Sequence, residues 1–288
     1  MNECLHDIFI LNNKIKKRKE FDSSYLDKGK SFYEVLRYND GCFLFLEDHL
    51  GRIANSIRLF NIDYILDLRS ITDSFLKLVL NNSVKLGNVK LVINFNDTSI
   101  LKPSILVYFI SHKYPDIEQY NSGIDVSLLS MERRMPNAKF VNIPVLNAVK
   151  KELIVKGFYE TLLVSNEGYI TEGSKSNVFF IKDDAIYTPP IQKVLPGITR
   201  KYVLDICNEL NIRLIEKDIS INDLTRYETI FISGTSAKIL PVRKINNISY
   251  NVNNRLIKQV IESYEKIIAR YTGRRKKNII EILDPLIL

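Results

Sequence analysis

The sequence predicts a mixed α+β protein of two domains, and three observations support this prediction. The chain has 288 residues, 45% hydrophobic and 10% aromatic, which is enough for one large core or two smaller ones. Short apolar segments typical of strands occur beside segments with the period of helices. Over residues 112–123 the periodicity is lost while Pro, Asn, Ser and Gly accumulate, as is typical of a linker.

A small N-terminal domain is expected over residues 1–114. It begins with the strands FYEVLRY and GCFLFLE, joined by a turn at Asn39-Asp40-Gly41. Helices are expected around 49–59 and over 70–80, because apolar residues recur there with helical spacing. The strands VKLVINF and SILVYFI complete this domain.

A larger C-terminal domain is expected over residues 124–288, after a linker at 115–123. Helices are expected over 145–156, 199–210 and 254–271, and the basic run GRRKK at 273–277 follows the last of them. The apolar face of the middle helix includes Cys207, which we therefore expect in the core. The expected strands are IDVSLLS, ETLLVS, YITEG, NVFFIK, AIYTP, RLIEKDI and TIFISG.

Composition excludes several classes of protein. The net charge is +8, but the basic residues are scattered, and no zinc-finger, RNP-type or basic-zipper pattern accompanies them, so nucleic-acid binding is not expected. Three widely spaced cysteines argue against a disulfide framework and a cysteine-based zinc site, and they favour the cytoplasm. No metal site is expected. The sequence has neither a secretion signal nor a run of about 18 apolar residues, so neither export nor membrane insertion is expected.

Two positions have the chemistry of an anion site. Residues 197–200, GITR, open the helix at 199–210, and a helix N-terminus presents N–H groups to which Thr199 adds a hydroxyl. The alternative is an ordinary N-cap in which Thr199 satisfies its own helix. The second position is the turn SGTS at 233–236, although such turns are common. Without a GxxxxGK[ST] loop, these positions indicate one phosphate rather than a nucleoside triphosphate.

Glu172 lies at the expected end of a strand in TEGSKSNVFF, where its carboxylate could pair with a cationic ring nitrogen. The alternative is a solvated strand end. A phosphate and a ring nitrogen occur together in pyridoxal phosphate, whose chemistry also requires a lysine that forms a Schiff base. Spacing alone does not identify that lysine in a chain with 41 Lys and Arg residues.

The order of motifs resembles the class IV aminotransferases, or fold-type IV pyridoxal phosphate enzymes, over most of the chain. This family includes branched-chain and D-amino acid aminotransferases and aminodeoxychorismate lyase. The resemblance runs from FYEVLRYNDGCFLFLEDHLGRIANSIRLF through NAKFVNIPVLNAVKKEL to TEGSKSNVFF, LPGITR and ETIFISGTSAKILPV. It implies two α+β domains with pyridoxal 5'-phosphate between them, working as a homodimer.

The resemblance also implies a role for individual residues. Lys139 in NAKFVN would be the Schiff-base lysine and Glu172 the partner of the pyridine nitrogen. Tyr33 would face the substrate side of the cofactor. The residues implied to bind the phosphate are Arg52, Ile198, Thr199, Thr235 and Ser236.

Alternatives to two of these roles stay open. Lys150 and Lys151 compete with Lys139, but they fall inside the helix expected at 145–156, whereas Lys139 has the apolar Phe140 beside it. Arg52 could instead be an exposed helical arginine.

The function that the resemblance implies is transfer of an amino group between an amino acid and a 2-keto acid, as in branched-chain aminotransferases. The alternative is an aminodeoxychorismate lyase that produces p-aminobenzoate and pyruvate, and a third is a binding protein without activity. The segment INFNDTSILKPSILVYF lacks the arginine and histidine with which D-amino acid aminotransferases hold the substrate carboxylate. The tyrosine that branched-chain aminotransferases place soon after the lysine is absent too. Arg133, Arg134 and Lys102 are the alternative carboxylate ligands.

Overall fold

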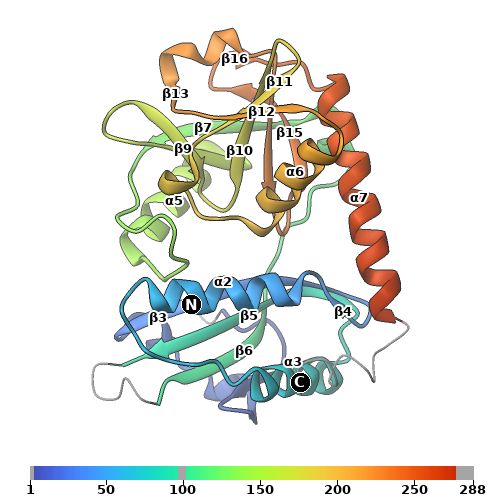
Figure 1. The fold of residues 1–288 in the computed structure, drawn as a ribbon. Coiled ribbons are helices and arrows are strands. Elements are labelled where there is room, and N and C mark those ends of the chain that lie inside the picture. The colour runs from blue at the N-terminus through green and yellow to red at the C-terminus, as the bar shows by residue number, and fades with distance from the viewer. Residues whose placement is uncertain (1–2, 97–101, 277–288) are drawn as a thin grey trace. The chain divides into compact units, whose positions relative to one another are not determined.

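The computed structural model describes residues 3–96 and 102–276, which separate into two compact units (Figure 1). Unit 1 contains the described residues up to Lys113, the short segment Ala138–Val141 and the described residues from Ile268 onward. Unit 2 contains Tyr114–Asn137 and Asn142–Ile267. Unit 1 therefore contains two segments from later in the chain, whereas the expected N-terminal domain was the continuous stretch 1–114.

Unit 1 is built on a six-stranded antiparallel sheet in the order β2-β1-β6-β5-β3-β4. Helices α2 and α3 pack against one face of this sheet, where Phe32, Ile53 and Phe75 are fully buried. Phe9 and Tyr108 pack on the other face. The elements are β1 (Ile8–Leu11), β2 (Lys14–Lys17), η1 (Arg18–Glu20), α1 (Ser24–Asp27), β3 (Lys30–Asn39), β4 (Cys42–Phe43), α2 (Leu46–Arg58), α3 (Leu68–Asn82), β5 (Leu86–Phe95) and β6 (Ser104–Ile110).

The prediction that GCFLFLE forms one strand is wrong except at Cys42 and Phe43. Only Cys42–Phe43 forms a strand, Phe45 has a left-handed backbone with φ of 55°, and α2 begins at Leu46. Glu47 and Asp48 lie in the first turn of α2, where acidic side chains interact favourably with the helix dipole. A continuous apolar run does not by itself distinguish a strand from the start of a buried helix, and this run contains both.

Unit 2 is built on a ten-stranded sheet in the order β12-β11-β10-β14-β15-β7-β8-β9-β13, with β16 paired to β15. Its strands are β7 (Ile124–Ser130), β8 (Glu160–Val164), β9 (Tyr169–Gly173), β10 (Asn177–Lys182), β11 (Ala185–Thr188), β12 (Arg213–Glu216), β13 (Ile219–Ser220), β14 (Thr229–Gly234), β15 (Lys238–Ile245) and β16 (Ile248–Ser249). Its helices are α4 (Ile117–Ser122), α5 (Ile143–Lys156), η2 (Ile191–Lys193), α6 (Ile198–Glu209), η3 (Ile221–Arg226) and the first part of α7 (Arg255–Lys276).

Most of the expected elements of unit 2 are present, but some differ. The expected strand RLIEKDI is two strands, β12 and β13, which lie at opposite ends of the strand order. The expected linker at 115–123 contains α4, which has a capping box between Asp116 and Gln119. Strand β15 was not among the expected strands. The basic run GRRKK does not follow the last helix, because α7 continues to Lys276. Lys277, the last residue of that run, lies outside the described residues.

The α+β prediction is confirmed, and so is the core position of Cys207, which is 1% exposed. Burial raises the pKa of its thiol to about 12, so it is not a reactive cysteine at neutral pH. Cys4 and Cys42 are also buried, and none of the three is in a disulfide. No helix in the described part of the chain is long and apolar enough to cross a membrane.

Candidate functional site

In unit 2, Glu172 is a buried and paired carboxylate. It lies on β9 and is 3% exposed. Its Oε2 accepts a hydrogen bond from the backbone N–H of Leu195 at 3.0 Å, and its Oε1 lies 3.1 Å from Nε of Arg133. Arg133 also donates from Nη2 to the carbonyl of Ser174. Glu172 is therefore not a solvated strand end, because a cation and a backbone donor hold it in one orientation.

A second buried carboxylate, Glu160 on the neighbouring strand β8, organises the turn that follows Glu172. It is 4% exposed. It accepts hydrogen bonds from both the backbone N–H and the hydroxyl of Ser174, from the N–H of Lys175 and from the hydroxyl of Ser176. The turn is so tight that a Cβ atom at Gly173 would lie 2.1 Å from Oγ of Ser176, so the sequence requires glycine there.

The predicted anion site at the start of α6 has the expected backbone geometry. The helix begins at Ile198, and its N-cap residue is Gly197, which has no side chain with which to cap it. Thr199 is buried, and its hydroxyl lies 3.3 Å from that of Tyr264 rather than on an N–H of its own helix. A Cβ atom at Gly197 would lie 2.0 Å from Oδ1 of Asn177, so only glycine allows this approach. Thr199 is therefore not the N-cap of α6, which was the alternative to an anion site.

The second predicted anion site, at 233–236, is adjacent to the first. Strand β14 ends at Gly234, which pairs with Lys238 across the turn that carries Thr235 and Ser236. Asn177 connects the two sites, since it pairs with Ser233 in the sheet and donates from Nδ2 to the carbonyl of Leu195 at 2.9 Å. The hydroxyl of Ser233 is buried and has no hydrogen-bond partner among the described residues. Unit 2 therefore brings 172–177, 195–199 and 233–236 together.

In unit 1, Lys139 lies on a short segment that pairs with β3. Phe140 forms a bridge with Phe32, and the carbonyl of Lys139 accepts a hydrogen bond from the N–H of Tyr33 at 3.0 Å. The N–H of Lys139 donates to the hydroxyl of Ser56 on α2, also at 3.0 Å. The backbone of Lys139 is thus fixed from both sides.

The side chain of Lys139 is half-buried, and its Nζ lies 4.7 Å from the centre of the Tyr33 ring. A second ammonium group, Nζ of Lys90 on β5, lies 5.1 Å from the same ring and is ion-paired with Glu3. Lys90 is 8% exposed and was missed by the sequence analysis. The available signal was a lone lysine within the apolar strand VKLVINF, because a buried charge needs a partner.

Arg52 is also placed in unit 1, with a buried partner that the sequence analysis missed. It donates from Nε and Nη2 to the two carboxylate oxygens of Glu34, at 2.7 and 2.6 Å. His49 Nδ1 lies 2.7 Å from Glu34 Oε2. Arg52 is thus not an exposed helical arginine, since its side chain is 8% exposed. His49, Arg52 and Ser56 recur at i, i+3 and i+7, which places them on one face of α2.

The charges in this triad follow from burial. Burial raises the pKa of the Glu34 carboxyl, but the adjacent Arg52 guanidinium and His49 outweigh it and lower the pKa to about 2. Burial lowers the pKa of His49 below its ordinary value of 6.5, although Glu34 opposes this change. We conclude that at neutral pH Glu34 is ionised and His49 is neutral. Nδ1 of His49 then carries the hydrogen, because an ionised carboxylate can only accept.

The alternatives to Lys139 and the alternative carboxylate ligands differ in burial. Lys150 and Lys151 are exposed on α5, and Arg134 and Lys102 are exposed as well. Arg133 contacts Glu172, as described above, and so has a role other than a solvent-facing charge.

The chain is similar to known proteins over most of its length. The model of the family "Amino-transferase class IV" matches residues 31–245. A putative branched-chain-amino-acid aminotransferase of Methanocaldococcus jannaschii is 28% identical over 290 residues, which cover 95% of this chain and 98% of the relative. A D-alanine aminotransferase of Bacillus licheniformis is 26% identical over 249 residues, covering 82% and 88%.

The fold is similar to a solved structure of the T.th. branched-chain amino acid aminotransferase with pyridoxamine 5'-phosphate. The TM-score is 0.80 at 22% identity, and the match covers 95% of this chain and 97% of the other. The family match spans most of the chain and includes Arg52, Lys139, Glu172 and the two predicted anion sites. The chain therefore belongs to the class IV aminotransferases, a family of pyridoxal-phosphate-dependent enzymes.

Proposed function

We propose that this enzyme transfers an amino group between an amino acid with an apolar, branched-chain-like side chain and a 2-keto acid. The observation that carries the proposal is the position of Glu172, which is buried, paired with Arg133 and hydrogen-bonded to the segment that leads into α6. A carboxylate held in this way beside two anion sites matches a ligand that has a ring nitrogen and a phosphate. The apolar substrate is supported by the names of relatives such as the putative branched-chain enzyme of Methanocaldococcus jannaschii.

The residues present fit pyridoxal phosphate. We propose that its phosphate is bound by the first turn of α6, at Ile198 and Thr199, and by the turn at Thr235 and Ser236. These sites offer a helix N-terminus, hydroxyls and backbone donors, and the buried Ser233 hydroxyl supplies one more polar atom beside them. Arg52 would add a guanidinium, whose orientation Glu34 fixes.

Lys139 would bind the cofactor covalently and afterwards move the α-proton of the substrate. Its backbone is fixed by Tyr33 and Ser56, so the amine swings from a constant anchor. Bound pyridoxal phosphate supplies an electron sink for the charge left when that proton is removed. Glu172 would keep the ring nitrogen protonated, and Arg133 keeps Glu172 in place. Tyr33, which lies against Lys139, would contact the substrate.

A half-reaction tests the proposed function. The purified protein, saturated with pyridoxal phosphate, is mixed with single L-amino acids without any keto acid, and the visible absorbance band of the bound cofactor is followed. We expect leucine, isoleucine or valine to abolish this band and 2-oxoglutarate to restore it. If no amino acid changes the band while aminodeoxychorismate yields pyruvate and p-aminobenzoate, the enzyme is a lyase and the proposal is wrong.

A further inference from the structure

Glu3 takes part in an ion pair of unit 1 that the proposed function does not use. Its Oε2 lies 2.7 Å from Nζ of Lys90 on β5 and accepts a hydrogen bond at 3.0 Å from the hydroxyl of Tyr108 on β6. Lys90 and Tyr108 are direct neighbours in the sheet, so their side chains leave it on the same face. This is the face opposite to α2 and α3, where Tyr108 packs with Phe9. Donors from two adjacent strands therefore converge on one carboxylate.

The two donors are buried, whereas the carboxylate is not. The side chain of Lys90 is 10% exposed and Tyr108 is fully buried, but the side chain of Glu3 is 43% exposed. Burial raises the pKa of the Tyr108 hydroxyl, so this group keeps its hydrogen and donates it. A buried ammonium group needs an anion beside it, because an unpaired buried charge is strongly destabilising. The site thus requires a carboxylate, but Glu3 can move into solvent when another carboxylate takes its place.

This site lies close to the amine of Lys139. Nζ of Lys90 and Nζ of Lys139 lie 5.1 and 4.7 Å from the centre of the Tyr33 ring, so their separation is no more than the sum of these two distances. In the proposed function, Lys139 moves the α-proton of the substrate and Tyr33 contacts the substrate. The α-carbon therefore approaches Lys139, and a substrate that extends past Tyr33 brings its far end to Lys90.

We propose that Glu3 determines how well the enzyme accepts a substrate with a second carboxylate, such as glutamate or 2-oxoglutarate. The second carboxylate binds Lys90 and Tyr108 in place of Glu3, whereas an apolar side chain leaves Glu3 where it is. The two carboxylates compete because Lys90 offers one positive charge, and two anions beside it repel each other. Glu3 therefore favours apolar substrates over dicarboxylic ones. This inference rests on the proposed function, which places the substrate beside Lys139 and Tyr33.

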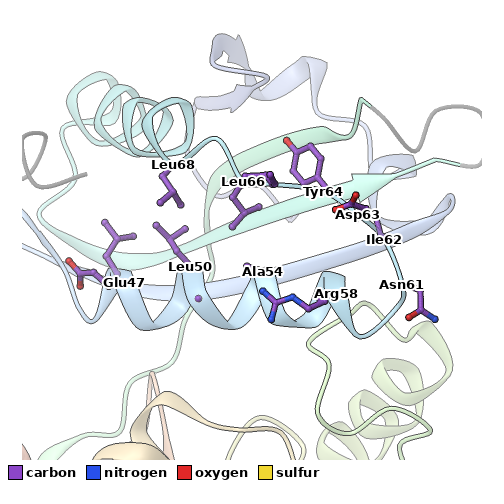
Figure 2. Close-up of a pocket in the computed structure, with 13 residues that line it drawn as sticks. Glu47, Leu50, Ala54, Arg58, Asn61, Ile62, Asp63, Tyr64, Leu66 and Leu68 are labelled. Atoms are coloured by element: carbon purple, nitrogen blue, oxygen red, sulfur yellow. The ribbon is translucent and has the colours of Figure 1, made fainter. Parts of the chain in front are cut away.

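A groove along α2 offers a dicarboxylate a different cation. It has a volume of about 1090 Å³ and is lined by α2 and by the chain that follows it as far as the start of α3 (Figure 2). Its wall is largely apolar, and in Figure 2 Leu50 and Leu68 point toward each other across it. Arg58 lines the groove, but so do Glu47 and Asp63, so carboxylates outnumber guanidinium groups among its lining residues. This charge disfavours a dicarboxylate, and Arg58 provides a control.

Binding of unreactive acids to the protein loaded with pyridoxal phosphate tests the inference. Glutarate carries two carboxylates and 4-methylpentanoate carries one, and neither has an amino or keto group that reacts with the cofactor. In calorimetric titrations we expect Glu3→Gln to tighten binding of glutarate about tenfold, because glutamine leaves Lys90 without a competing anion. Binding of 4-methylpentanoate should stay unchanged. Lys90→Met should weaken binding of glutarate, and Glu3→Gln should then have no further effect in the double variant.

Two variants serve as controls. Glu20 is also paired with a lysine and its side chain is also 43% exposed, so Glu20→Gln is matched to Glu3→Gln. Arg58→Gln removes the cation of the groove. Neither control should change the affinity for glutarate. An unchanged affinity in Glu3→Gln would show that Glu3 only neutralises Lys90. Equal tightening of both acids would show that Lys90 binds the carboxylate common to all substrates. Either result would overturn the inference.

Failure of the proposed function is seen separately, because binding of the two acids needs no turnover. The proposed function fails if no amino acid changes the absorbance of the bound cofactor in the half-reaction. If the half-reaction proceeds, Glu3→Gln should also raise kcat/KM for 2-oxoglutarate relative to 4-methyl-2-oxopentanoate by a factor similar to the gain in glutarate affinity. Damage to the fold would instead lower both values, and an unchanged ratio would contradict the role of Glu3.

Discussion

The carboxylate of Glu34 holds Arg52 with two hydrogen bonds, 2.7 Å from Nε to Oε1 and 2.6 Å from Nη2 to Oε2, in the core of unit 1. Two nitrogens of the guanidinium are thus fixed in one plane. This bidentate contact sets the direction of the side chain that we propose as a phosphate ligand. The pair also makes the stability of unit 1 depend on pH.

Acid should destabilise the protein through Glu34, whose pKa is lowered from 4.5 to about 2. A carboxyl with a depressed pKa contributes stability above its unfolded pKa, and this contribution is lost as pH falls through the folded value. The loss should be on the order of 3 kcal/mol between pH 4.5 and 2. Urea unfolding at a series of pH values measures it. Glu34→Gln should flatten this part of the profile, and an unchanged profile would mean that Glu34 is not the responsible group.

His49 should add a shallower dependence at higher pH. Its folded pKa is below the unfolded value of 6.5, so the unfolded chain takes up a proton first and stability falls as pH drops below 6.5. His49→Gln keeps a donor for Glu34 and cannot titrate. This variant should lose the slope just below pH 6.5 in the same urea series, relative to the native protein. A persistent slope would assign it to another group.

Arg52→Lys should weaken binding of pyridoxal phosphate about tenfold, because lysine keeps the charge but cannot make the bidentate contact with Glu34. Turnover at saturating cofactor should change little. Fluorescence titration of the apoprotein gives the affinity. Arg58→Lys, six residues further along α2 and exposed, is the matched control and should bind normally. Equal affinities for the two variants would remove Arg52 from the proposed site.

Lys139→Ala should abolish both turnover and the covalent attachment of pyridoxal phosphate. Borohydride reduction followed by peptide mapping identifies the labelled residue, which we expect to be Lys139 in the native protein. Lys150→Ala and Lys151→Ala should leave activity unchanged, because both side chains are exposed on α5. A label on either of those lysines would show that Lys139 is misassigned.

The sequence predicted best those features that depend on local pattern. The strand NVFFIK and the start of α6 after Gly197 were found from periodicity and turn chemistry. The partners of the predicted residues were not found, because they are distant in the chain. Glu34 lies 18 residues before Arg52, and Leu195 lies 23 residues after Glu172. Such pairs form only when strands and helices pack together, so no local pattern encodes them.

Glu172→Gln should retain cofactor but lower turnover by several orders of magnitude. The amide keeps the shape of the side chain and loses the charge that would hold the ring nitrogen protonated. It also leaves Arg133 without its anionic partner, which should lower stability. Single-turnover kinetics with bound cofactor measure the effect apart from binding. Glu167→Gln, in the exposed turn between β8 and β9, is the control. Near-normal turnover in Glu172→Gln would exclude the proposed role.

Glu160→Gln should impair the enzyme although Glu160 is not among the proposed ligands. Its two carboxylate oxygens accept hydrogen bonds from the hydroxyls of Ser174 and Ser176 and from two backbone N–H groups of the same turn. Glutamine offers one oxygen and one NH₂ group, so at least one donor of the turn would face another donor. A buried donor left without an acceptor costs about 1–3 kcal/mol.

The substitution should also weaken cofactor binding, because this turn connects Glu172 to Asn177, which contacts both proposed anion sites. We therefore expect Glu160→Gln to lower the free energy of unfolding by about 1–3 kcal/mol and to weaken binding of pyridoxal phosphate in parallel. Urea unfolding of the apoprotein and cofactor titration measure the two effects. Ser174→Ala, which removes one donor together with its need for an acceptor, should restore part of both losses in the double variant. If the unfolding free energy falls while cofactor affinity stays normal, Glu160 supports the fold alone and does not position the turn.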